Sequence, residues 1–486
     1  MMEAAEEKRV LGENEASSEA SEVDHHLEAK LIRKLDIRII PLTMLLYLFS
    51  FLDRVNIGNA RLYGLEKDLG LKGNQYQTAV SLLFVTYVLC ELPSNLVIKK
   101  FTPSRWIAFL CTGWGIVATL TGLVQSYAGL IVCRLILGAL EAGLFPGLAI
   151  YLTMFYTKSE IALRVSYLFV SAAIAGACGG LLAYAIGHMD GVAEQSGWRW
   201  IMIIEGLPCI VLGIATWFIF ADTPESASYL TPAEKALLAA KRARDPGQTP
   251  SAQAFHWADV RAGLTDWKIY AFCVAQFGAD TMLYGYSTFL PTIIHGIAPH
   301  WSSALVQVLT IPCYATGALT YLAVAWWSDR TQRRGLPCVL VGVASLVGYA
   351  ILISDVPSGA HYAGCFLVAL GLYVVVGIPL AWLPANNPRY GKRTTAGGLQ
   401  LTFGNAAGIM APFLYPSSEG PRYVRGHSVT LALVAFAMIV YGGMSAWFSA
   451  ANHRRRERGV EEKYAGLTRE ELDEMGDKSP WFVYTV

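Results

Sequence analysis

The stretch Ser50–Ala60, SFLDRVNIGNA, closes an apolar run that begins near Ile37 and places an aspartate beside an arginine. A helix of about 20 apolar residues crosses the hydrocarbon core of a bilayer, so this run predicts a membrane-spanning helix. A charge inside such a helix costs free energy and is rarely placed there without a use. Asp53, Arg54 and Asn56 therefore indicate a functional site near one end of the span.

The composition of the whole chain is that of a membrane protein. Of its 486 residues, 54% are hydrophobic and 15% are charged, against about 25% charged residues in ordinary soluble domains. The mean hydropathy is +0.40, and apolar stretches recur from end to end. The net charge of +1 gives no indication of nucleic-acid binding, so the expected surroundings are a lipid bilayer.

Counting apolar runs of about 20 residues predicts twelve spanning helices in two sets of six. We expect the first six at about 38–58, 77–98, 105–125, 128–154, 163–188 and 198–221, and the second six at about 267–291, 303–327, 337–354, 361–384, 394–415 and 427–450. The chain then divides into a tail 1–37, a first bundle 38–221, a polar linker 222–266, a second bundle 267–450 and a tail 451–486. The expected fold is an all-α membrane protein with twelve transmembrane helices in two halves.

The orientation in the membrane follows from the basic residues in the short loops. Every second loop is rich in Lys and Arg, as at Lys99, Lys100 and Arg105, and so is the tail, with HRRRERG at 453–459. This pattern predicts that both tails and the linker are cytosolic, and the plasma membrane is the expected location. The first 37 residues are acidic, which predicts a disordered tail rather than a cleaved signal.

Two arginines form the first candidate site. Arg54 lies on the order of 6–10 Å from the outer end of its helix, at 1.5 Å per residue, and Arg134 lies at a similar depth on the same side. Two guanidinium groups facing one cavity would hold a carboxylate, because their planar fork matches its geometry. The spacing predicts that Arg54 and Arg134 bind an organic anion.

Two acids are candidates for carrying a proton. Glu141 follows Arg134 by two helical turns, on nearly the same face, and a partly desolvated carboxylate takes up protons more readily. Glu141 and Asp53 are therefore the proton-coupling candidates. The alternative for Glu141 is an Arg–Glu pair that only holds helices together, and Asp53 could pair with an arginine or cap the interface.

Polar residues in the other spans complete the set. Asp280 lies mid-helix with Tyr284 nearby, and Asn405 lies in a span rich in small residues, so these three and Asn56 are expected to line the substrate path. Glu91, near Pro93 and a basic loop, and Glu205, beside Gly206 and Pro208, are interpreted as structural.

Metal and enzyme signatures are absent from the sequence. The nine cysteines are single and form no C-x-x-C pair, and the nine histidines form no metal-binding spacing. There is also no phosphate-binding G-x-x-x-x-G-K. We expect neither an enzyme nor a metal or cofactor site.

Several motifs together resemble the major facilitator superfamily, and within it the anion:cation symporter branch of fungal allantoate- and nicotinate-permease-like carriers. They are LDRVNIGNA (52–60), RLILGALEAGLFPG (134–147), GWRWIMIIEGLP (197–208), FLPTII (289–294) and GKRTTAGGLQLTFGNAAGI (391–409). The resemblance implies two six-helix bundles that rock about a central site, with Arg54 and Arg134 binding the anion and Glu141 as the acid of the fourth span. It also implies proton symport.

The resemblance further implies a gating loop. The family's loop of acidic and basic residues is partly kept in SDRTQRRG as Asp329, Arg330, Arg333 and Arg334. The copy in the first half, SNLVIKKFTPSRW (94–106), has no acidic residue at the corresponding place.

The function predicted from the sequence is secondary active transport of a small organic carboxylate, with protons as coupling ion, by a monomer. Export of a metabolite by proton antiport, or sensing without transport on the same fold, are the alternatives. Tyr284, Tyr286 and Phe289 suit a small ring carboxylate, although the sequence does not identify the substrate.

Overall fold

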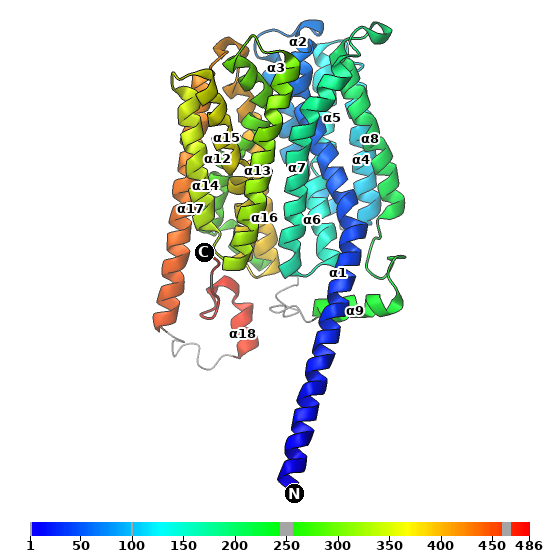
Figure 1. The fold of residues 1–486 in the computed structure, drawn as a ribbon, viewed down its shortest axis with the longest axis vertical. Coiled ribbons are helices and arrows are strands. Elements are labelled where there is room, and N and C mark those ends of the chain that lie inside the picture. Colours follow the sequence, from blue (N-terminus) through cyan, green and yellow to red (C-terminus); the bar gives the residue numbers. More distant parts are fainter. Residues whose placement is uncertain (1, 99–100, 244–255, 459–467) are drawn as a thin grey trace.

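Helices account for all regular structure in the part of the chain that the structure describes. The computed structural model describes residues 2–98, 101–243, 256–458 and 468–486. The long helices stand side by side, with α2 (Leu65–Asp68) at one end of the molecule and α9 (Pro232–Ala243) at the other (Figure 1). We refer to these as the α2 end and the α9 end.

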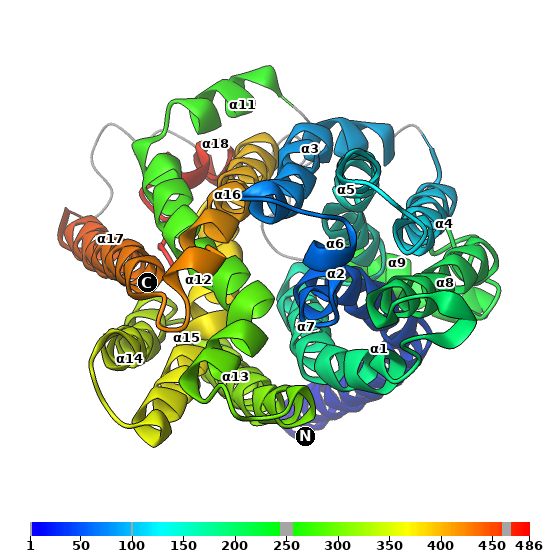
Figure 2. The ribbon, with the colours of Figure 1, turned by 90° about the horizontal axis from the view of Figure 1, so that it is seen from above.

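Each of the twelve expected spans coincides with helix, which confirms the predicted fold class. The first six spans are α1 (Met2–Leu62), α3 (Gln75–Ile98), α4 (Pro103–Thr121), α5 with α6 (Tyr127–Glu141 and Leu144–Phe155), α7 (Lys158–Gly187) and α8 (Gly197–Ile219). The second six are α12 (Trp267–Ile297), α13 (Ser303–Thr331), α14 (Gly335–Ile353), α15 (Ser358–Ala385), α16 (Tyr390–Met410) and α17 (Val424–Arg458). Seen from above, these sets form two bundles that lie next to each other (Figure 2).

Eight of the described helices are long and apolar enough to cross a membrane by length and composition alone. α12 and α16 are not among these eight, and both carry polar side chains in the middle of the helix, such as Gln276, Asp280 and Gln400. These polar side chains are among the candidate site residues or their neighbours on the same helices.

The acidic N-terminal segment differs from its predicted form. The backbone of α1 is helical from Met2, where the sequence analysis predicts a disordered tail. Ala, Glu, Leu and Lys, which have high helix propensities, are frequent in this segment and account for the difference.

The two bundles touch each other closely toward the α2 end. Gly58 of α1 lies against α12, where an added Cβ would come 2.5 Å from the carbonyl oxygen of Thr288. Asn59 accepts a hydrogen bond of 3.4 Å from Gln307 of α13. Ser81 of α3 donates one of 2.7 Å to the carbonyl of Ile409 in α16. The α2 end is thus closed between the halves.

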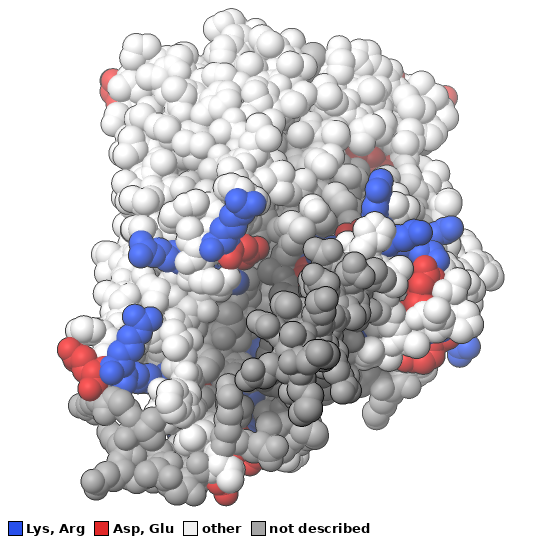
Figure 3. All heavy atoms as spheres, turned by 60° about the horizontal axis from the view of Figure 1, so that its bottom comes forward, with Lys and Arg blue, Asp and Glu red and all other residues white. Residues whose placement is uncertain are grey.

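At the α9 end, short segments are fastened to one bundle each. On the first bundle, Lys34 of α1 pairs with Glu234 of α9 at 2.7 Å, and Lys241 of α9 pairs with Glu160 of α7 at 2.5 Å. Charged side chains gather on this end, whereas the flank above it is almost free of them (Figure 3). This distribution is what an aqueous face next to a lipid-facing belt requires.

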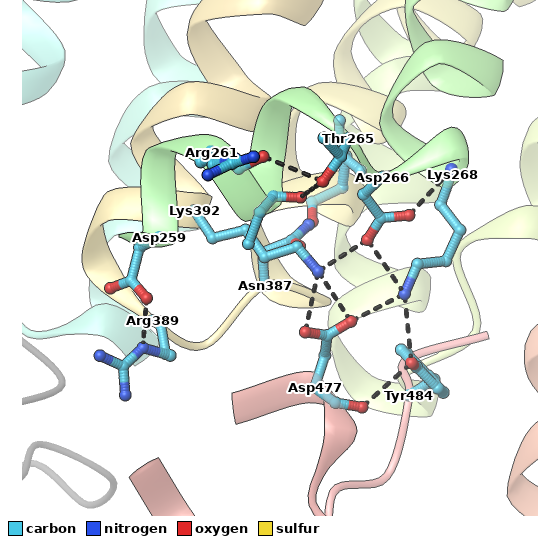
Figure 4. Close-up of polar contacts among 12 residues, drawn as sticks. Asp259, Arg261, Thr265, Asp266, Lys268, Asn387, Arg389, Lys392, Asp477 and Tyr484 are labelled. Atoms are coloured by element: carbon cyan, nitrogen blue, oxygen red, sulfur yellow. Dashed lines mark hydrogen bonds and ion pairs between the residues drawn. The ribbon is translucent and has the colours of Figure 1, made fainter. Parts of the chain in front are cut away.

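The C-terminal segment is fastened to the second bundle. It contains α18 (Arg469–Glu474) and the short helix η5 (Gly476–Lys478). Lys268 of α12 and Lys392 of α16 both reach Asp477, at 2.7 and 2.8 Å (Figure 4). Arg389 joins α16 to Asp259 of α11 (Trp257–Leu264) at 2.6 Å.

Candidate functional site

An ion pair between α1 and α5 lies at the centre of the candidate site. Arg54 donates from Nε and Nη2 to the same oxygen of Glu141, at 3.2 and 3.0 Å. The Glu141 side chain is fully buried, and that of Arg54 is 10% exposed. Arg54 is therefore the member of the pair that an incoming molecule can reach.

The local sequence explains why Glu141 stands where it does. α5 ends at Glu141, and the chain passes through Ala142 and Gly143 before α6 begins at Leu144. Pro146 in the first turn of α6 has no N–H to continue the hydrogen-bond ladder. The span is thus interrupted directly after the acid, as in carriers whose discontinuous helices line a binding site.

The second predicted arginine, Arg134, is less accessible than Arg54 in this structure. It is 2% exposed, two turns before Glu141 on α5, and its Nε has no hydrogen-bond partner among the described residues. Its charge interacts with Tyr76, Glu141 and Asp53. In this conformation Arg134 is buried inside the first bundle, while Arg54 is accessible.

Aromatic rings surround the Arg54 guanidinium. The Tyr87 ring lies 4.9 Å from it and the Phe84 ring 5.8 Å, both on α3. Tyr284 of α12 meets Phe84 edge to face at 4.5 Å. Cations over ring faces are stabilised, and flat apolar walls of this kind suit a planar ligand.

The second bundle contributes polar groups from α12 and α16. Tyr284 donates a hydrogen bond of 2.6 Å to Oδ1 of Asn405. One turn away, Asp280 accepts one of 3.0 Å from Gln276. Gly404 permits this approach, because a Cβ there would lie 2.0 Å from Oδ2 of Asp280. Three predicted site residues, Asp280, Tyr284 and Asn405, are thus brought together.

Glu91 belongs to the same group, although the sequence analysis interprets it as structural. Its Oε2 accepts a hydrogen bond of 3.2 Å from Nδ2 of Asn405. The residue is 4% exposed and interacts electrostatically with Arg54. The sequence did contain a signal for Glu91, because an acid within a span is a functional candidate by default. Its closeness to Pro93 and to the basic loop favoured the structural interpretation instead.

Asp53 and Asn56 point toward α8. Asp53 accepts a hydrogen bond from the Cys209 thiol, with a sulfur–oxygen distance of 3.1 Å. Asn56 donates one of 2.6 Å to Glu205. These bonds lie within the first bundle, so in this conformation the two residues join α1 to α8.

The predicted gating loop lies at the α9 end, between α13 and α14. Arg334 lies 3.6 Å from Asp329, and the Arg330 guanidinium stacks over Trp326 at 4.1 Å, while Arg333 is exposed. The backbone N–H groups of Arg334 and Gly335 donate to the carbonyl oxygen of Val486, at 2.5 and 3.3 Å. The C-terminal segment thus reaches this loop.

Comparison with known proteins assigns the family. The family model described as Major Facilitator Superfamily matches residues 43–412. The chain belongs to this superfamily. The protein is therefore an integral multi-pass membrane transporter of a small molecule and not an enzyme.

Curated relatives of this superfamily member match over nearly its whole length. An uncharacterized transporter of Schizosaccharomyces pombe is 40% identical over 90% of this chain and 88% of its own. The high-affinity nicotinic acid transporter of Saccharomyces cerevisiae is 31% identical over 99% of this chain and 89% of its own. Both relatives support membership of the superfamily.

Solved structures agree with the superfamily fold. A bacterial homologue of the human lysosomal transporter Spinster, in an inward-facing and unoccupied conformation, aligns with a TM-score of 0.65. The alignment covers 84% of this chain and 96% of that chain at 16% identity. The similarity concerns the fold alone.

Proposed function

We propose that the protein carries a small planar carboxylate of the nicotinate type, together with a proton, by alternating access of the site around Arg54. The observation that carries this proposal is the Arg54–Glu141 pair, in which the accessible member is a cation. The rings of Phe84, Tyr87 and Tyr284 around it support a flat, unsaturated substrate. The similarity to a nicotinic acid transporter supports the same class.

The pair offers a direct way to couple an anion to a proton. Arg54 and Glu141 together are neutral, and a substrate carboxylate can take the place of Glu141 at the guanidinium. Glu141 then loses its only ion-pair partner among the described residues and keeps the charge of Arg134, which makes no hydrogen bond to it, nearby. A buried carboxylate without a hydrogen-bonded counter-ion is costly, so it takes up a proton. One anion and one proton enter, and the charge of the site is unchanged.

The same proposal assigns the remaining roles. Asp280, Tyr284 and Asn405 hold the far side of the substrate from the second bundle, and Arg134 stabilises the buried acids of the first bundle. Asp53 and Asn56 act by positioning α1 against α8. The α9 end is cytosolic, the protein is a monomer in the plasma membrane, and the loop Asp329–Arg334 acts as a gate.

Transport by the purified protein in proteoliposomes tests the proposal. An inward proton gradient is imposed, and uptake of radiolabelled nicotinate is compared with that of the neutral nicotinamide, with and without a protonophore. We expect nicotinate to accumulate and the protonophore to abolish this accumulation. A rate of nicotinate uptake that is the same with and without the proton gradient refutes proton coupling. Equal uptake of nicotinamide refutes the role of the carboxylate.

A further inference from the structure

We propose that the hydrogen bond between Glu91 and Asn405 is a latch that holds the α2 end closed, and that an anion bound at Asn405 and Tyr284 releases it. The existence of the latch depends only on the alternating movement of the two bundles and not on the identity of the substrate. Its release by an anion rests on the proposed function. Glu91 thus acts as a positioning residue of the transport cycle.

The bond joins the two bundles. Glu91 is on α3 of the first bundle and Asn405 is on α16 of the second, and both side chains are buried, at 4% and 8% exposure. Asn405 also binds Tyr284 of α12. A chain of three polar side chains therefore runs from one bundle into two helices of the other.

Neighbouring contacts between the same two helices are of a weaker kind. Ser81 donates to the Ile409 carbonyl at 2.7 Å, and the Phe84 ring packs on Gly408. One is a neutral hydrogen bond and the other an apolar contact. A carboxyl–amide hydrogen bond shielded from water is the stronger type, and the charge of Glu91 strengthens it further when the group is ionised.

Opening the α2 end must break this bond. The α2 end is closed by contacts between the bundles, and α3 cannot separate from α16 while Glu91 holds Asn405. Losing one hydrogen bond to a charged group changes such a conformational equilibrium by roughly tenfold. The bond therefore biases the equilibrium toward the form in which the α2 end is closed.

The substrate would compete for the same donors. The Tyr284 hydroxyl donates to Oδ1 of Asn405, which fixes the amide so that Nδ2 faces Glu91. A substrate carboxylate near Arg54 accepts from the Asn405 amide in place of Glu91, and from the Tyr284 hydroxyl in place of the Asn405 oxygen. Binding then removes the partner that keeps Glu91 attached to the second bundle.

The test measures closure of the α2 end in the full-length protein without substrate. Cysteines replace Asn59 and Gln307, which meet across the bundles, in a background in which the exposed Cys178 is serine. The rate of oxidative cross-linking then reports the closed population. We expect Glu91→Ala to lower this rate, because one lost hydrogen bond to a charged group changes the equilibrium constant between the closed and open forms by roughly tenfold.

A pair of variants separates the latch from general damage. Asn405→Asp keeps an acceptor for Tyr284 but sets a carboxylate against Glu91, so it should lower cross-linking as Glu91→Ala does. Adding Glu91→Gln supplies an amide donor to the new aspartate and should restore the rate. Asp259→Ala removes a buried carboxylate and its ion pair with Arg389 within the second bundle and should leave the rate unchanged.

Two results would overturn the latch. The first is cross-linking of Glu91→Ala at the parent rate, and the second is failure of Glu91→Gln to rescue Asn405→Asp in a monodisperse protein. For the release step, nicotinate at a concentration that saturates uptake should slow cross-linking of the parent, and an unchanged rate refutes release. A protein that does not take up nicotinate at all contradicts the proposed substrate and leaves the substrate-free result on the latch intact.

Discussion

Arg54 directs both of its hydrogen bonds to one oxygen of Glu141, Oε2, and the other oxygen, Oε1, is buried with no hydrogen-bond partner among the described residues. Arginine therefore stabilises Oε2 of the carboxylate, and Oε1 is the oxygen that can accept a proton.

Glu141→Gln should uncouple transport from the proton gradient. The glutamine oxygen still accepts a hydrogen bond from Arg54, but the side chain no longer carries a proton. We expect nicotinate exchange between the two sides of the vesicle to persist, while accumulation driven by a proton gradient is lost. Glu194→Gln, at an exposed position, is the matched control. Accumulation by Glu141→Gln equal to that of the parent would exclude Glu141 as the coupling acid.

Arg54→Lys should weaken substrate binding although the charge is kept. A lysine ammonium cannot present two fixed donors to a carboxylate, and the loss of one charge-assisted hydrogen bond corresponds to roughly tenfold in affinity. KM for nicotinate should rise by about this factor. Arg422→Lys, whose side chain is 43% exposed, serves as control and should leave KM unchanged. An unaltered KM in Arg54→Lys would contradict the anion-binding role.

Gly404→Ala should damage both stability and transport. The new methyl group would lie 2.0 Å from Oδ2 of Asp280 and 3.0 Å from Cγ of Gln276, so Asp280 must move and strain its bond to Gln276. Overpacking of this kind costs about 1–3 kcal/mol, which a lowered Tm and a reduced uptake rate should report. Gly398→Ala, on the same helix with no atom within 4 Å, should be neutral or slightly stabilising. Equal behaviour of the two variants would refute the close contact.

Asp477→Asn should loosen the C-terminal segment. The carboxylate accepts bonds from Lys392 at 2.8 and 2.9 Å and from Lys268 at 2.7 Å. Although burial raises the pKa of Asp477, the two lysines outweigh it and hold the pKa below its ordinary value of 3.8. We expect a lower Tm and faster proteolysis of the segment, whereas Asp355→Asn, with a side chain 95% exposed, should change neither.

The same residue gives a pH dependence. A carboxylate whose pKa is lowered on folding contributes stability that is complete above its unfolded pKa and is lost as the pH falls through its folded pKa. The Tm difference between the parent and Asp477→Asn should therefore be constant at neutral pH and vanish only below pH 3.8. A difference that already disappears near neutral pH would show that Asp477 is not held as an anion.

The positions of the helices were largely readable from the sequence. Apolar run length reports burial in lipid directly, so even the span interrupted between Glu141 and Leu144 was located. The prediction of a disordered N-terminal tail rests on composition, which reports the lack of a core and not local helix propensity. The chain carries no periodicity that would reveal the docking of residues 468–486.

The partners of the site residues were less predictable. Spacing along α5 placed Arg134 and Glu141 on one face, yet which of Arg54 and Arg134 would take Glu141 depends on how α1 packs against α5. Glu91 could be recognised as a buried acid, but its partner Asn405 is 314 positions away in the other bundle. Such pairs arise from tertiary packing, and a single sequence does not encode them locally.

The ion pairs at the α9 end indicate where the polypeptide could be cut into two fragments. α9 is tied to α1 and α7 of the first bundle, and α11 is tied through Asp259 to Arg389 beside α16 of the second. The linker is therefore anchored to the first half before positions 244–255 and to the second half directly after them. Two separately translated fragments, cut within those positions and co-expressed, should each fold around their own six helices and assemble into a working carrier.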